Sequence, residues 1–169
     1  MVSEAEPTDN LVNPDDEIFY NPLDMIEAFD SYFKKTGQSK LKFIHQYIAC
    51  AYNSLGLSFA YFINTLEELT QRKYEVVNMI GGGCQSEHLC RTAANYSQKQ
   101  VFSGPVECAT IGNILVQGIT LGKIKDINSG RVLVENSFPV KLYKPEMDEN
   151  QSKHMYQKFI KLKTIEDVR

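Results

Sequence analysis

The chain has 169 residues, of which 43% are hydrophobic and 23% charged, and its formal net charge is −3. These values are ordinary for one globular domain with a hydrophobic core. They exclude the strongly basic composition typical of nucleic-acid-binding proteins, and no apolar run reaches the roughly 20 residues that a membrane-spanning helix needs. We therefore expect neither a nucleic acid nor a membrane among its partners.

The N-terminal residues are acidic and polar, and they lack the apolar stretch of a signal peptide. Residues 1–12 are predicted to form a disordered lead-in. The cysteines show no spacing typical of a disulfide framework, so they are predicted to be free thiols. They are Cys50, Cys84, Cys90 and Cys108. Free thiols are typical of the reducing cytoplasm, which is the expected location.

Two helices are predicted in the first half of the chain. In the first, Asn21 is the expected N-cap, Pro22 is the first helical residue, and Gly37 ends the helix. The second spans residues 43–70, where apolar residues recur at helical spacing. Gly56 interrupts this apolar stripe, which suggests close packing against a neighbouring element.

Strands and helices alternate in the second half of the chain, which indicates an α/β fold with parallel strands. The predicted strands span residues 74–80 and 100–103, and the predicted helices span 87–96, 109–119 and part of the charged tail after residue 144. Two strands alone do not make a stable sheet. We therefore expect that the sheet is incomplete, with an exposed edge, and that the chain corresponds to part of a larger protein.

The most informative motif is the triplet Gly81-Gly82-Gly83, which separates the first predicted strand from the next helix. Because glycine has no Cβ, the backbone here can adopt positive φ and let a flat ligand approach closely. The N-terminus of the following helix adds unpaired N–H groups and a positive dipole end. This pattern favours a nucleotide site, although the triplet alone is equally compatible with a turn that binds nothing. It fits neither the dinucleotide fingerprint nor the G-x-x-x-x-G-K-[ST] phosphate loop.

Other reactive side chains have simpler interpretations. Cys84 and His88 are four residues apart, but no fourth ligand is evident, so a buried thiol is the preferred reading of Cys84. Glu107 is expected to favour the start of a helix rather than to act as a catalytic acid. Asp15 and Asp16 are expected to be solvated turn residues rather than magnesium ligands.

The glycine turn and residues 104–117 together resemble the C-terminal half of rhamnulokinases, which are FGGY carbohydrate kinases of the actin-like ATPase superfamily. Residues 13–22, 36–38 and 54–55 support the match. The similarity runs from about Asn13 to Pro145. Within this match, Asn95 stands where the family usually has aspartate, and Gln98 stands where it usually has glycine.

The resemblance implies a partial ribonuclease H-like, actin-like domain over residues 13–145, followed by a charged helix or tail over residues 146–169. It implies transfer of the γ-phosphoryl group of ATP, with Mg²⁺, to the 1-hydroxyl of L-rhamnulose. By motif, Gly82 would lie against the nucleotide, flanked by Gly81 and Gly83, and Ser86 would lie near the adenine. The catalytic aspartate, the sugar contacts, the phosphate loops and the Mg²⁺ ligands belong to parts of the family that nothing here matches. No catalytic residue and no metal ligand is therefore assigned to this chain.

The partners that the resemblance implies are a nucleotide and the missing N-terminal kinase half, with the sugar bound only in the full enzyme. The chain is expected to be active only when it is joined to that half. Two alternatives remain open. The chain is a noncatalytic remnant or partner chain that binds nucleotide or the matching half, or it serves another FGGY sugar kinase.

Overall fold

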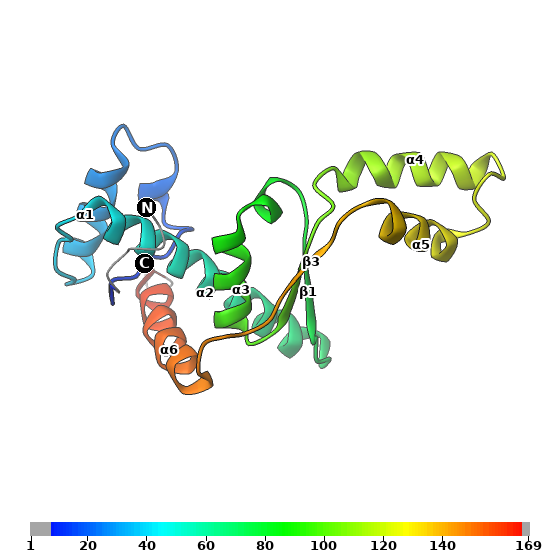
Figure 1. Ribbon diagram of the computed structural model, residues 1–169. Coiled ribbons are helices and arrows are strands. Elements are labelled where there is room, and N and C mark those ends of the chain that lie inside the picture. Colours follow the sequence, from blue (N-terminus) through cyan, green and yellow to red (C-terminus); the bar gives the residue numbers. More distant parts are fainter. Residues whose placement is uncertain (1–7, 167–169) are drawn as a thin grey trace.

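The computed structural model describes residues 8–166 (Figure 1). Its helices and strands are, in chain order, the 3₁₀ helix η1 (Glu17–Phe19), α1 (Met25–Lys35), α2 (Ile44–Thr70), β1 (Val76–Met79), the 3₁₀ helix η2 (Gly82–Gln85), α3 (Glu87–Ser97), β2 (Gln100–Ser103), α4 (Cys108–Thr120), α5 (Ile127–Ser137), β3 (Lys141–Tyr143) and α6 (Glu149–Glu166). Helices and strands alternate along much of the chain after α2.

The sheet has three strands in the order β1-β2-β3. β1 and β2 are parallel, with Val77 beside Val101, whereas β2 and β3 are antiparallel, with Val101 beside Tyr143. The prediction of an α/β fold with parallel strands is confirmed for the first pair. The antiparallel β3 and the helix α5 before it were not predicted, because β3 is only three residues long and depends on pairing with a distant segment.

One face of this sheet is packed against helices. Successive residues of a strand point to opposite faces, so Val77, Met79, Val101 and Tyr143 share one face. Met79, Val101 and Tyr143 are buried in one cluster with Cys84 of η2 and with residues of α3, namely Cys90, Ala93 and Ala94. α3 therefore forms the helical layer on this side.

Gly56 lets α2 approach α3 closely, as its place in the apolar stripe predicts. A Cβ added to Gly56 would lie 2.5 Å from Thr92 Cγ2 and 2.9 Å from the Thr92 carbonyl oxygen. No side chain fits there without a shift of the backbone of α3. The glycine thus fixes the distance between the two helices behind the sheet.

The N-terminal region is more ordered than the predicted lead-in. Leu11 and Val12 are 1% and 2% exposed. Their N–H groups donate to Gln38 Oε1 and Ser54 Oγ, at 2.9 and 3.0 Å. The prediction of a disordered lead-in is therefore wrong for these residues, while residues 1–7 lie outside the described part of the chain.

The first long helix begins later than predicted. Asp24, rather than Asn21, is its N-cap, and the Asp24 carboxylate accepts hydrogen bonds from the N–H groups of Ile26 and Glu27. Asn21 has φ of 104°, in the left-handed region, which differs from the extended conformation of an N-cap residue. Gly37 follows the helix at φ of 70°, so the predicted end is confirmed.

The helix predicted in the charged tail is α6, and it is packed against the rest of the molecule. Phe159 is fully buried and Met155 is 7% exposed, in a cluster with Leu57 and Ala60 of α2 and with Leu11. Ser152 donates a hydrogen bond to the Tyr96 carbonyl at 3.0 Å. α6 thus belongs to the same hydrophobic core as α2 and α3.

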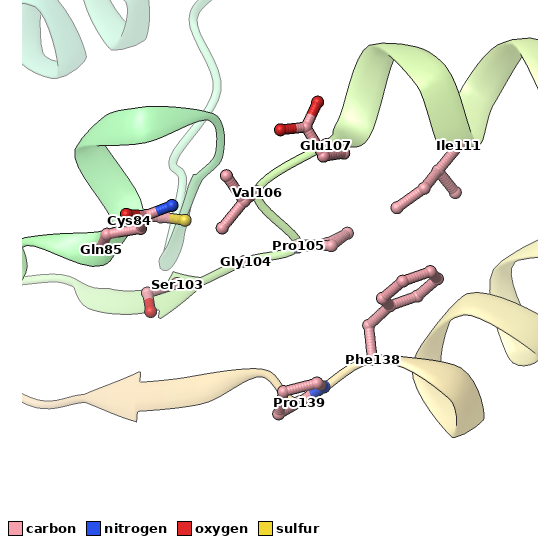
Figure 2. A pocket seen from close by; sticks show the side chains of 10 residues that line it. All are labelled: Cys84, Gln85, Ser103, Gly104, Pro105, Val106, Glu107, Ile111, Phe138 and Pro139. Carbon is pink, nitrogen blue, oxygen red and sulfur yellow. The ribbon is translucent and has the colours of Figure 1, made fainter.

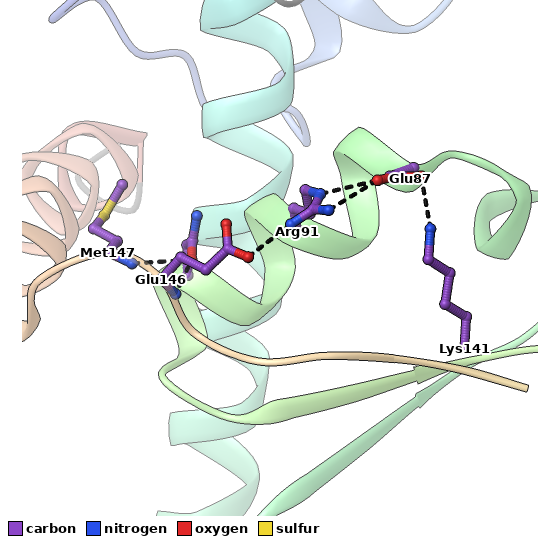
Figure 3. Close-up of polar contacts among 6 residues, drawn as sticks. Glu87, Arg91, Lys141, Glu146 and Met147 are labelled. Carbon is purple, nitrogen blue, oxygen red and sulfur yellow. Dashed lines mark hydrogen bonds and ion pairs between the residues drawn. The ribbon is translucent and has the colours of Figure 1, made fainter.

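Polar contacts fix the segment that joins β3 to α6 (Figure 3). Glu87 on α3 pairs with Lys141 of β3 at 2.7 Å and with Arg91 at 2.9 Å, and Arg91 reaches Glu146 at 2.8 Å. Asn95 Oδ1 accepts from the N–H groups of Glu146 and Met147 at 2.7 and 3.2 Å. Asn95 therefore holds this connection.

The helices α4 and α5 extend away from the sheet, on the side opposite α1 and α6 (Figure 1). Leu115 and Gly130 are their buried residues, and they face each other across the pair. Apolar side chains of α4 and α5 such as Ile114 and Val132 are 61% and 55% exposed. Separately, none of the helices within residues 8–166 combines the length and apolar character that crossing a membrane requires.

Candidate functional site

The glycine turn has an open backbone. Gly81 has φ of 72° and ψ of −162°, a conformation that favours glycine, and Gly82 then begins the 3₁₀ helix η2. Of the three glycines, only Gly81 has positive φ, so the expectation of positive φ in this turn holds for that residue. A Cβ added to Gly81 or Gly82 would meet no heavy atom within 4 Å.

Two backbone donors of this turn are free for a ligand. Within residues 8–166, no group accepts a hydrogen bond from the N–H groups of Gly82 and Gly83, whereas Cys84 N–H donates to the Gly81 carbonyl at 3.2 Å. Both glycines are exposed to solvent. The turn therefore presents two N–H donors without acceptors in this part of the chain, at the carboxyl end of β1.

Ser86 has a structural role at the start of α3. It is the N-cap residue, and its Oγ accepts a hydrogen bond from Leu89 N–H at 3.3 Å. The Ser86 and Tyr52 hydroxyl oxygens are 3.5 Å apart. The Tyr52 ring in turn packs edge-on against His88, with 4.6 Å between ring centroids. Ser86 thus lies beside the turn, as the sequence indicates, and links it to α2.

A pocket of about 280 Å³ adjoins the turn (Figure 2). It lies between η2, the carboxyl end of β2 and the segment that enters β3. Its lining residues are Cys84, Gln85, Ser103, Gly104, Pro105, Val106, Glu107, Ile111, Phe138 and Pro139. In open α/β sheets, ligands bind outside the carboxyl ends of parallel strands, where both the turn and this pocket lie. The volume is slightly below the roughly 300–1,000 Å³ of typical ligand pockets.

None of the predicted site residues, Gly81, Gly82, Gly83 and Ser86, lines this pocket, which the turn adjoins through Cys84 and Gln85. Phe138 and Pro139 were missed because they lie between two elements, α5 and β3, that were not predicted. The sequence does contain one signal for α5: Asp126 precedes it and accepts hydrogen bonds from the Ser129 N–H and Oγ at 2.8 and 2.9 Å, as an N-cap does.

The acidic residue at the pocket rim does not cap its helix. Glu107 is the N-cap residue of α4, but its side chain accepts no capping hydrogen bond, and it is exposed. This carboxylate therefore satisfies none of the free N–H groups in the first turn of α4. Figure 2 shows Glu107 at the rim, on the side opposite Phe138 and Pro139.

The thiols below the turn are buried and structural. Cys84 is 6% exposed, which confirms the preferred reading of this residue, and Cys90 is fully buried. Burial, with a contribution from the neighbouring Cys84, raises the pKa of the Cys90 thiol, and burial lowers the pKa of His88. Both shifts favour the neutral forms. The cysteines are free thiols, as predicted.

No residues described here are arranged as a metal site. Within residues 8–166, no three histidine, cysteine, aspartate or glutamate side chains come close enough to hold an ion. Asp16 caps η1 and pairs with Lys35, and Asp15 pairs with Lys163 at 2.7 Å. The Asp15 side chain is exposed, as expected of a solvated turn residue, but the same expectation is wrong for Asp16, whose side chain is 8% exposed.

A family model and individual relatives both connect this chain with carbohydrate kinases. The model of "FGGY family of carbohydrate kinases, C-terminal domain" matches residues 1–121. The rhamnulokinase of Bacteroides thetaiotaomicron is 36% identical over 149 residues, which are 86% of this chain and 31% of that protein. The rhamnulokinase of Bacillus subtilis is 34% identical over 142 residues, which are 84% of this chain and 29% of that protein. This chain thus spans about a third of the length of these curated relatives.

Proposed function

Because this chain belongs to the FGGY family of carbohydrate kinases, matching its C-terminal domain, we propose that it forms the nucleotide-binding side of an ATP-dependent kinase that phosphorylates L-rhamnulose at the 1-hydroxyl. In this proposal the chain contributes to an actin-like domain. The location is the cytoplasm, where ATP is available.

The open backbone of the glycine turn is the observation that carries the proposal. Gly82 and Gly83 offer N–H donors without acceptors in the described chain, and a Cβ added to Gly82 would meet no heavy atom within 4 Å. Backbone N–H groups before a helix N-terminus suit the anionic and polar atoms of a nucleotide. We infer that the nucleotide lies against Gly82, between Gly81 and Gly83, with Ser86 next to the adenine side.

Phosphoryl transfer depends on positioning and on stabilisation of charge rather than on covalent chemistry by the protein. The described residues provide the first of these by holding one side of the nucleotide. They do not fit a magnesium site, because no cluster of suitable ligands is present within residues 8–166. We therefore assign neither a magnesium ligand nor a catalytic base to them, and the proposal places both in the remaining part of the kinase.

The sugar is proposed from the relatives alone. Both proteins named above are rhamnulokinases, with identities of 34% and 36%. No residue of this chain is assigned to sugar contacts. Phosphorylation of another sugar in preference to L-rhamnulose, by an enzyme that contains this chain, would correct the substrate and leave the nucleotide site in place.

Nucleotide titration with a thermal-shift readout tests the site. ATP is expected to raise the melting temperature of the chain, and Gly82→Ala is expected to weaken nucleotide affinity by about tenfold, equivalent to about 1.4 kcal/mol. The added methyl group meets no protein atom within 4 Å, so the ligand-free melting temperature should remain close to that of the wild type.

Gly112→Ala on α4 is the matched control, since an added Cβ also meets no atom within 4 Å there. It should leave the ATP-induced shift unchanged. Equal shifts for Gly82→Ala and the wild type would place the nucleotide elsewhere. If ATP causes no shift in the wild type, the chain by itself is not a nucleotide binder, and the alternative of a noncatalytic partner chain gains support.

A further inference from the structure

The second face of the sheet is bare. Val76, Asn78, Phe102 and Leu142 point away from α3, because they alternate with the residues packed against it. Val76 and Leu142 are 42% and 40% exposed. Within residues 8–166, none of the buried clusters contains a residue of this face. Parallel strands are normally covered on both faces, so a layer is missing here.

The outer edge of β1 is also unpaired. Gln100 N–H donates to the Glu75 carbonyl at 3.2 Å, and Gly104 N–H donates to the Met79 carbonyl at 2.9 Å. In a parallel ladder with this register, alternate residues of β1 bond to β2, so Val77 also faces β2. The N–H and carbonyl groups of Val76, Asn78 and Ile80 therefore point outward, and no group within residues 8–166 pairs with them.

The helix α4 shows a similar lack of cover. Its thirteen residues, Cys108–Thr120, include no charged side chain, yet Leu115 is the one buried residue of this helix. A largely apolar helix without a charged face is typical of a protein interior. Three neighbouring parts of the structure, the bare face, the unpaired edge and α4, thus have the surface chemistry of buried elements.

From these surfaces we propose that the edge of β1 and the bare face form a docking site for the polypeptide that precedes the matched segment in the kinase. An extended strand of that polypeptide pairs with Val76, Asn78 and Ile80, and apolar side chains cover Val76, Phe102 and Leu142. The identity of the partner rests on the proposed function. The matched family model is that of a C-terminal domain, and this chain covers only 29% and 31% of the two relatives, so their remaining chain supplies such a partner.

Hydrogen exchange of the isolated full chain tests the unpaired edge. The amides of Val76, Asn78 and Ile80 should exchange rapidly, while those of Val77 and Met79 should be protected by at least about 100-fold more. Protection of all five amides in a monomer would overturn the proposal, because the chain would then cover its own edge. The same protection in a dimer, detected by sedimentation, would identify a second copy as the occupant and would also overturn it.

A pair of proline variants gives an independent reading in the isolated chain. Asn78→Pro removes an outward N–H and should leave the melting temperature nearly unchanged, whereas Val77→Pro removes an N–H bonded to β2 and should lower it clearly. Equal losses for both variants would contradict a free edge.

A chimaera tests the partner. The full 169-residue chain replaces the matched segment of the Bacteroides thetaiotaomicron rhamnulokinase, and the Val76, Asn78 and Ile80 amides are measured again. They should become protected by at least about 100-fold. Rapid exchange in a folded chimaera, as judged by circular dichroism, would overturn the docking site.

The matched variants Leu142→Glu and Leu23→Glu distinguish the bare face from any exposed apolar position. Leu142 and Leu23 are 40% and 109% exposed, so both changes should leave the isolated chain folded. In the chimaera only Leu142→Glu should remove the protection of the β1 edge, and equal effects of the two variants would contradict the proposal.

Kinase activity of the chimaera is measured separately. Protected amides without activity would leave the docking site standing and weigh against the proposed function, whereas activity with unprotected amides would do the reverse.

Discussion

The helices α3 and α4 begin in a similar way and end in different surroundings. Each follows a parallel strand, and a glycine with positive φ comes shortly after each strand, Gly81 at 72° and Gly104 at 106°. α3 packs against the sheet through Cys90, Ala93 and Ala94, whereas α4 projects outward. The local sequence determines the turn and the helix. Whether the helix is covered depends on which surface the rest of the protein offers to it.

The strongest contrast is expected between a buried residue of the packed body and an exposed residue beside α4. Phe159→Ala should lower the free energy of unfolding by about 3–5 kcal/mol, because it leaves a cavity among α2, α3 and α6. Leu121→Ala, at a position that is 73% exposed, should change it by less than about 0.5 kcal/mol. Denaturant unfolding of both variants checks this, and similar losses would show that the end of α4 is packed in solution.

Alanine at two helical glycines should have opposite effects. Gly56→Ala places a methyl group 2.5 Å from Thr92 Cγ2 and should cost about 1–3 kcal/mol through overpacking of α2 on α3. Gly112→Ala on α4 meets no neighbour and should stabilise the protein by about 0.5–1 kcal/mol through higher helix propensity. Thermal unfolding gives the sign of each change, and a loss at Gly112 would mean that α4 has a close neighbour.

Loss of the cap of α3 should have an intermediate effect. Ser86→Ala removes the oxygen that accepts from Leu89 N–H, and it should lower the free energy of unfolding by about 1 kcal/mol. Ser86→Thr keeps a hydroxyl and should recover most of the loss. Urea unfolding of the wild type, Ser86→Ala and Ser86→Thr measures these differences in stability. A threonine variant as unstable as the alanine variant would point to a role other than capping.

The smallest effect on stability is expected from protonation of Glu67 at low pH, because its partner Lys73 is exposed to solvent. Hydrogen bonds from Lys73, from Tyr74 N–H and from Lys99 lower the pKa of Glu67 to about 2. The ordinary pKa of glutamate in an unfolded chain is about 4.3. The stability that these contacts provide is therefore complete above about pH 4.3 and is lost as the pH falls toward 2.

Unfolding of the wild type and of Glu67→Gln between pH 2.5 and 5, taken as about the window that these pKa values span, checks this sign. The free energy of unfolding of Glu67→Gln should depend less on pH in that window than that of the wild type. Glu149→Gln, which removes a carboxylate from an exposed pair with Lys153, serves as the control. An equal pH dependence of Glu67→Gln and the wild type would show that Glu67 is not linked to folding.

The sequence predicted the elements whose patterns are local. The apolar stripe of α2, the strand before Gly81 and the strand over residues 100–103 all lie where they were expected. In contrast, α5 contains Gly130 and two β-branched valines, so its helical pattern is weak. β3 exists only because it pairs with β2, and a pattern within three residues cannot reveal such pairing.

The candidate site was predicted in the same uneven way. Gly81, Gly82, Gly83 and Ser86 lie together at the carboxyl end of β1, as their spacing indicates. They do not line the adjoining pocket, whereas Phe138 and Pro139, which do, come from a segment more than fifty residues away in the sequence. Asn95 illustrates the converse. The sequence showed only that it stands where the family usually has aspartate, whereas in the structure its side chain accepts hydrogen bonds from the N–H groups of Glu146 and Met147.

The four cysteines differ in burial, so their reaction with a thiol reagent reports on opening of the fold. Cys108 is partly exposed, whereas Cys50, Cys84 and Cys90 are buried, and burial raises the pKa of Cys50 to about 12. A thiol reagent should therefore modify one position in the native protein and the other three only as α2 and the region below the glycine turn open. Mass spectrometry of timed labelling would follow the two halves of the molecule separately, without any engineered probe.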